Sequence, residues 1–171
     1  MRITRTLLVM VLAVAGGAAS CPGLDESQPL TKARATEIEK GVRAFARNVA
    51  HDVTEEGPAA WRKHFADDPA FFMASEGRLV FPNGAAARAA IPELSRTIKK
   101  IELTWGDDLR VDPLAPNLAV IASPWHETLV NADGQRIEEN GYFTGIAEYR
   151  SGRWQFRNAH WSVAAPAPPV R

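Results

Sequence analysis

The stretch NGYFTGIAEYRSGRWQFRNAHWS, Asn140 to Ser162, decides the fold of this chain. It contains two aromatic-rich runs separated by Ser151-Gly152, a dipeptide typical of a tight hairpin turn. The first run is part of a longer segment from Arg136 to Tyr149, and the second is part of a segment from Arg153 to Val163. Their length predicts two long antiparallel strands near the C-terminus.

Two more long strands are expected before this hairpin, over Ile101 to Val111 and Leu118 to Asn131. Asp133-Gly134 is the turn between the second of these and the hairpin. Earlier in the chain, Glu76-Gly77 separates two short runs that resemble strands. Everything after Lys100 is therefore predicted to form an antiparallel meander.

The region before Lys100 is mainly helical. Apolar residues recur at steps of three or four along a first, long helix that is expected to end near Gly57: Ile38, Val42, Phe45, Val49 and Val53. Pro58 suits the first position of a shorter second helix that carries Trp61 and Phe65. Asn83 suits the cap of a third helix, which Pro92 is expected to divide or kink.

Helices followed by a long meander indicate an α+β domain, with the helices on one face of a curved sheet. This order of elements resembles the NTF2-like cone of the SnoaL-like proteins and ketosteroid isomerases. The aromatic strand, the G-x-W turn at Gly152 and the final H-x-S at His160 are similar to the end of the SnoaL-like and DUF4440-type branch. The resemblance implies a cavity between sheet and helices that binds a small molecule.

The composition sets limits on function. The chain has 171 residues, with 20 Lys and Arg against 20 Asp and Glu. This balance gives no electrostatic basis for binding nucleic acid. The expected domain covers residues 31–165, and the proline-rich residues 166–171 are expected to be a disordered tail.

Residues 1–20 have the layout of a secretory signal, with two arginines, an apolar run too short to cross a bilayer and small residues before Cys21. The sequence AASC resembles a bacterial lipobox, which implies lipidation of Cys21 and a lipid anchor in the membrane. The alternative is ordinary export with cleavage nearby. Residues 21–30 are a tether in both cases.

His160 is the first candidate catalytic residue. Strict alternation puts it on the same face as Trp154 and Phe156, which is expected to be the face that the helices cover. His160 would then point into the cone. The alternative is a core imidazole that a backbone carbonyl or Asn158 satisfies.

Asp107 is the second candidate. It interrupts the apolar face of Ile101 to Val111, and in an apolar pocket its pKa would rise, making it a usable general base. The alternative is a bulge or turn at Gly106, which would expose Asp107 to water.

Several aromatic side chains are candidates for ligand binding: Trp105, Trp125, Phe143, Tyr142 and Tyr149. Pro124 is expected to produce a bulge that changes the face of Trp125. The four histidines lack the spacing of a zinc site, so no metal and no cofactor are predicted.

Two functions follow. The first is binding of a small, largely apolar molecule in the cone, with proton transfer of the isomerase or cyclase type. The second is a non-catalytic envelope module that forms a homodimer through the outer face of the sheet.

Overall fold

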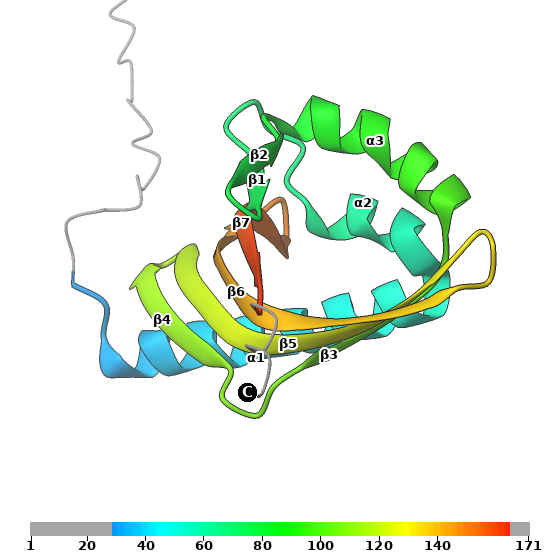
Figure 1. The fold of residues 1–171 in the computed structure, drawn as a ribbon. Coiled ribbons are helices and arrows are strands. Elements are labelled where there is room, and N and C mark those ends of the chain that lie inside the picture. Colours follow the sequence, from blue (N-terminus) through cyan, green and yellow to red (C-terminus); the bar gives the residue numbers. More distant parts are fainter. Residues whose placement is uncertain (1–28, 165–171) are drawn as a thin grey trace, which may run out of the picture.

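The structure is a computed structural model that describes residues 29–164. A curved sheet of seven strands is covered on one face by helices (Figure 1). The predicted signal, Cys21 and the predicted tail lie outside the described residues. Within residues 29–164, no helix is both long enough and apolar enough to cross a membrane.

The first helix, α1 (Lys32–Glu56), forms as predicted. The Thr31 side chain caps it by accepting a hydrogen bond from the Arg34 N–H, and Gly57 ends it with a φ of 71°. Its buried stripe contains the five predicted apolar positions. A short 3₁₀ turn, η1 (Gly57–Ala60), and the single-turn helix α2 (Trp61–His64) follow.

The third helix, α3 (Gly84–Thr97), begins after Asn83, whose side chain accepts from the Ala86 N–H. It continues through Pro92, so the expectation that this residue divides the helix is wrong. Pro92 and Arg88, four residues before it, are both exposed. The carbonyl that loses its N–H partner is therefore on the side of the helix that faces water, where its loss is tolerated.

The sheet has the strand order β2-β1-β7-β6-β5-β3, and β4 also pairs with β5. Its strands are β1 (Phe72–Ser75), β2 (Arg78–Phe81), β3 (Ile98–Trp105), β4 (Arg110–Ala115), β5 (Leu118–Asn131), β6 (Arg136–Arg150) and β7 (Arg153–Val163). β1 is parallel to β7, so the sheet is mixed, whereas the sequence predicted an antiparallel one. β5 stays in register with β6 through Pro124, and the predicted bulge there is absent.

The predicted strand from Ile101 to Val111 is two strands. β3 stops at Trp105, and the Gly106 N–H donates to the Pro124 carbonyl oxygen at 2.8 Å. Asp107 and Asp108 form a turn, after which β4 pairs with an earlier part of β5. β3 and β4 thus occupy the same side of β5 in succession.

A bulge in β7 changes which side chains face the helices. Phe156 pairs with Ala147 and Asn158 pairs with Ile146, which leaves Arg157 as an extra residue. The Asn158 side-chain oxygen accepts from the Ile146 N–H at 2.9 Å and so satisfies a backbone donor at the bulge. Beyond this point the inward residues are Ala159 and Trp161, because one extra residue reverses the alternation.

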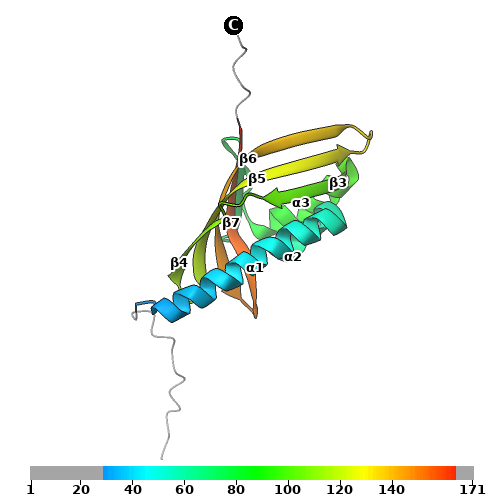
Figure 2. The same ribbon diagram turned by 90° about the horizontal axis from the view of Figure 1, so that it is seen from below.

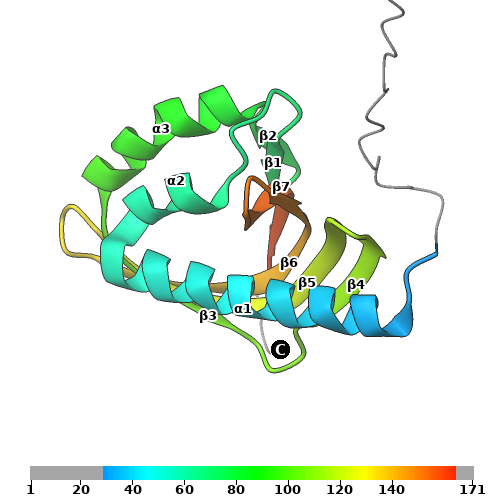
Figure 3. The same cartoon turned by 180° about the vertical axis from the view of Figure 1, so that it is seen from behind.

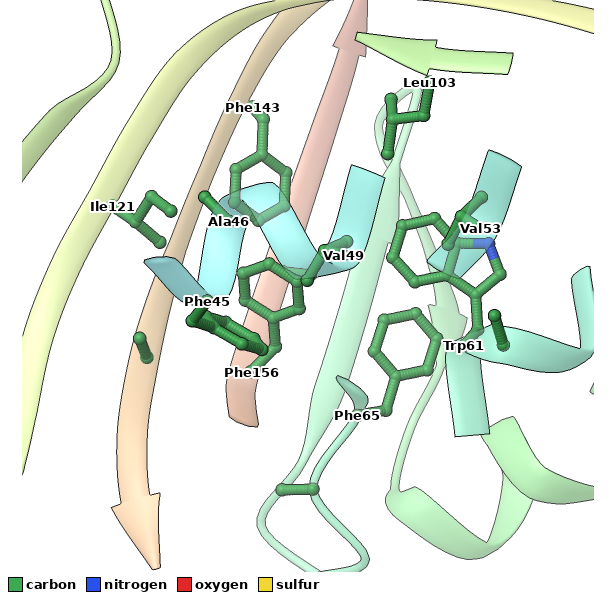
Figure 4. Packing of buried hydrophobic residues seen from close by; sticks show 14 of the residues in the cluster. Phe45, Ala46, Val49, Val53, Trp61, Phe65, Leu103, Ile121, Phe143 and Phe156 are labelled. Atoms are coloured by element: carbon green, nitrogen blue, oxygen red, sulfur yellow. The ribbon is translucent and has the colours of Figure 1, made fainter. Parts of the chain in front are cut away.

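The core lies between α1 and the concave face of the sheet. α1 runs along this face and contacts β3, β4, β5 and β7 (Figures 2 and 3). Phe45 and Val49 of α1 meet Phe143 and Phe156 of the sheet (Figure 4). The ring centroids of Phe143 and Phe156 are 5.1 Å apart, a distance typical of favourable aromatic contacts.

Candidate functional site

A cavity of about 230 Å³ lies at the other end of the concave face. Residues from η1, α2, the β1–β2 hairpin, α3 and the strands line it. Most of them are apolar, including Trp61, Phe65, Phe81, Leu94, Ile101, Trp125, Leu129 and Trp161. Such a concave apolar space with few polar groups is the usual form of a small-molecule site.

The charged residues that line the cavity are Glu76, Glu127 and Glu139. Glu127 of β5 and Glu139 of β6 are direct partners across the two strands. Neither has an ion-pair partner in the part of the chain that the structure describes. Two carboxylates therefore face one apolar space without a neutralising cation.

This environment changes the proton affinity of Glu127. Burial, and secondarily the charge of Glu139, raise the pKa of Glu127 from 4.5 to about 7. The carboxyl group is thus close to half ionised at neutral pH. A group in this state can accept or donate a proton with little cost, which is the requirement for a general acid or base.

Trp125 lies two residues before Glu127 on the same face of β5 and lines the same cavity. Only 4% of it is exposed, and its Nε1–H has no hydrogen-bond partner among residues 29–164. Its ring meets that of Trp161 edge-on, with 5.3 Å between centroids. A buried donor without an acceptor is uncommon, since such groups are almost always paired.

Two of the predicted ligand-binding aromatics pack in the core or against it. Phe143 is fully buried between Phe156 and Trp161. Trp105 stacks on Trp161, and its Nε1–H donates to the Ala46 carbonyl oxygen of α1 at 2.8 Å. Neither residue lines the cavity, whereas Trp125 does.

The other predicted site residues lie outside the cavity. Tyr142 and Tyr149 are 39% and 45% exposed. His160 is exposed, so the prediction that it points into the cone is wrong: the bulge at Arg157 turns it to the outer face. Asp107 is exposed in the turn after β3, as the alternative interpretation predicted. The structure therefore does not bring Asp107 and His160 together.

Another pair of titratable groups lies beside α1. His64 of α2 is buried against Phe45, with its Nε2 atom 3.2 Å from an Asp52 carboxylate oxygen. Burial lowers the pKa of His64, although the Asp52 charge opposes this effect. His64 does not line the apolar cavity. Among the described residues, no group of three His, Cys, Asp or Glu side chains is arranged to hold a metal ion.

The sequence does contain a signal for Glu127. Alternation along β5 places Ile121, Ser123, Trp125, Glu127 and Leu129 on one face, so Glu127 is a carboxylate on a largely apolar face. The same argument selected Asp107.

No family model matches the chain. No curated protein matches it either. Similarity is found among solved structures.

An NTF2-like superfamily protein from Salmonella enterica serovar Typhimurium superposes with a TM-score of 0.62 at 17% identity, covering 81% of this chain and 96% of the other. A putative scytalone dehydratase from Novosphingobium aromaticivorans gives a TM-score of 0.63 at 10% identity, with 80% and 91% covered. A hexachlorocyclohexane dehydrochlorinase (LinA type 2) gives 0.63 at 12% identity, with 82% and 94% covered.

These identities are low, so the similarity concerns the course of the backbone and not the chemistry of the site. The order of helices and strands, the curvature of the sheet and the position of the helices agree with the architecture predicted from the order of elements along the chain. The chain has the NTF2-like α+β fold.

Proposed function

We propose that this protein binds a small, largely apolar molecule in the cavity and that Glu127 transfers a proton to or from a carbon atom of that molecule. The observation that carries the proposal is the position of Glu127, on the wall of an apolar cavity and with a pKa near 7. Glu127 takes the role that the sequence suggested for Asp107 and His160.

The proposed chemistry is removal of a proton from carbon next to an electron-withdrawing group. A carboxylate in an apolar space is a stronger base than one in water, because its ionised form is less well solvated. Two proteins that share the fold are named as a dehydratase and a dehydrochlorinase. Both names describe loss of H–X from a substrate, which also requires removal of a proton.

One observation supports ligand binding over the non-catalytic alternative. Rings fill the end of the cone around Phe156, yet a cavity persists beside Trp125. The outer face beside β7 carries exposed aromatic side chains, Phe72 and Tyr142, next to the polar His160 and Ser162. Anchoring through Cys21 and formation of a homodimer stay predictions.

The experiment uses deuterium exchange. The purified protein is incubated in D₂O with a panel of apolar ketones, and label at the carbon next to the carbonyl is measured by mass spectrometry. We expect Glu127→Gln to slow the catalysed exchange by about 100-fold or more, because the amide cannot carry the proton. Asp107→Asn and His160→Ala are the controls and should retain the rate. Full exchange by Glu127→Gln would exclude the proposed role.

Native mass spectrometry of the protein purified from its own source complements this test, since a retained molecule would identify the substrate class directly.

A further inference from the structure

The lining of the cavity has one sign of charge. Glu76, Glu127 and Glu139 line it, and none of its lining residues is Lys, Arg or His. An anionic ligand would therefore meet uncompensated repulsion in a space of low dielectric constant, where the repulsion is strongest. Ligands that carry a carboxylate or phosphate are selected against.

The pair formed by Glu127 and Glu139 is unfavourable as it stands. Like charges directly opposite each other on neighbouring strands destabilise a sheet, because their Cβ atoms are only about 5 Å apart. Nothing in residues 29–164 forms an ion pair with either carboxylate. A cation between them would remove this cost.

The cavity wall also favours a cation on an organic molecule. Trp61, Trp125 and Trp161 line it. Indole faces attract ammonium groups, and the attraction is larger where water is excluded. The apolar remainder of the wall suits a hydrocarbon body, which a bare metal ion lacks.

The ring of Trp125 contributes to this wall. Its side chain is 4% exposed, lines the cavity two residues before Glu127 on the same face of β5, and meets Trp161 edge-on. The apolar and aromatic wall thus adjoins the carboxylates directly.

We infer that the ligand is an apolar molecule with a protonated amine, which the facing carboxylates of Glu127 and Glu139 bind. This inference rests on the proposed function, because it assigns a substrate class to the same cavity. Glu139 is the residue that determines specificity for the amine.

An ammonium group at this position also prepares the proton transfer. The charge of Glu139 is one of the two causes of the raised pKa of Glu127. A bound cation neutralises that charge and favours the ionised form of Glu127. The substrate would thus hold Glu127 in the ionised form that can accept a proton, although the same cation removes part of the extra basicity that the apolar cavity gives this carboxylate.

Three probes of equal chain length test the inference: n-octylamine, 1-octanol and octanoate. Their affinities for the full protein at pH 7.5 are measured by isothermal titration calorimetry. We expect octylamine to bind at least about 10-fold more tightly than octanol, and octanoate to bind most weakly. Glu139→Gln should weaken octylamine binding by about 10-fold and change octanol binding less than twofold.

Glu138→Gln is the matched control, since it removes the same charge from the adjacent, exposed residue of β6, which pairs with Arg136. Equal binding of octylamine and octanol would overturn the inference, as would an equal effect of the two substitutions. The octanol measurement separates the two proposals: octanol binding without a preference for the amine refutes only the substrate class. Absence of binding by all three probes refutes ligand binding in the cavity as well.

Discussion

The two ends of the concave face differ in what fills them. Around Phe156 the space is closed, because Phe45 and Phe143 pack against this ring and all three are nearly or fully buried. Around Glu127, on the same face of the sheet, a cavity of about 230 Å³ is left open. The same fold thus provides a closed core at one end and an open cavity at the other.

The difference separates the part of the cone that is packed for stability from the part to which we assign the proposed function. The titratable group beside the rings of the closed end is His64, which lies 3.2 Å from an Asp52 carboxylate oxygen. At the open end, Glu127 and Glu139 have no ion-pair partner among residues 29–164. Unpaired polar groups cost stability when buried. The closed end supplies the packing that offsets this cost.

The largest expected effect lies at the closed end. Phe156→Ala should lower the free energy of unfolding by about 3–5 kcal/mol, because it removes a fully buried ring from a close-packed cluster. Leu129→Ala, at the cavity wall, should cost only about 1–2 kcal/mol, since Leu129 is partly exposed and already borders open space. Urea denaturation measures both, and Phe156→Leu is a milder variant in case the alanine variant does not fold. Equal costs at the two ends would contradict the comparison.

The second effect is the pH dependence of stability. Glu127 binds its proton more tightly in the folded protein, with a pKa of about 7 against 4.5. Between these two values the unfolded chain loses the proton first, so the free energy of unfolding falls as the pH rises. At pH 8 the ionisation of Glu127 should therefore lower the free energy of unfolding by about 3 kcal/mol relative to pH 4.5.

Glu127→Gln should abolish this fall in the free energy of unfolding, because the amide does not ionise. Denaturation of the two proteins at pH 4.5 and pH 8 measures it, with Glu138→Gln as the control of equal charge. If the stability of Glu127→Gln falls between pH 4.5 and pH 8 by as much as that of the unaltered protein, Glu127 is not the group that causes the pH dependence.

A third test concerns the boundary between the two ends, where Gly141 pairs with Trp125 on one side and Val163 on the other. A Cβ atom on Gly141 would overlap with the Ser162 carbonyl oxygen, so the backbones of β6 and β7 would have to separate. Gly141→Ala should therefore cost about 2 kcal/mol in a denaturation experiment. A cost below about 0.5 kcal/mol would show that this close approach is not required.

The smallest effects on stability are expected for substitutions of exposed residues outside the cone. His160→Ala and Asp107→Asn replace exposed side chains and should each change the free energy of unfolding by less than about 0.5 kcal/mol. Ligand affinity, measured with the same alcohol and amine probes, should also be unchanged. Loss of binding in either variant would mean that the site extends beyond the cavity.

Much of the fold could be predicted from the sequence because its turns are local. Ser151 and Gly152 have positive φ values of 52° and 82°, a conformation that fixes a two-residue hairpin wherever it occurs. The predicted bounds of β5 and β7 agree with the structure for the same reason. Helix α1 was predictable from the spacing of its buried residues.

The site was less predictable because it depends on the faces of strands over long distances. The bulge at Arg157 reverses the face predicted for every residue after it, and the sequence Arg157 to His160 contains no signal that predicts an extra residue. Gly106 and Asp107 did indicate the interruption between β3 and β4, and the exposed position of Asp107 followed from it. The cavity itself depends on side chains from six or more elements, whose relative positions the sequence pattern does not give.

The bulge in β7 also makes Arg157 a spare residue of this strand. Its removal would leave Phe156 and Asn158 opposite the same partners in β6, so that Trp161 would still point into the cone and His160 would still point out. Insertion of one residue after Asn158, with the bulge kept, would instead reverse the faces and bring His160 and Ser162 inward. The same change in length by one codon is thus harmless at one position of the strand and replaces part of the cavity wall at the next.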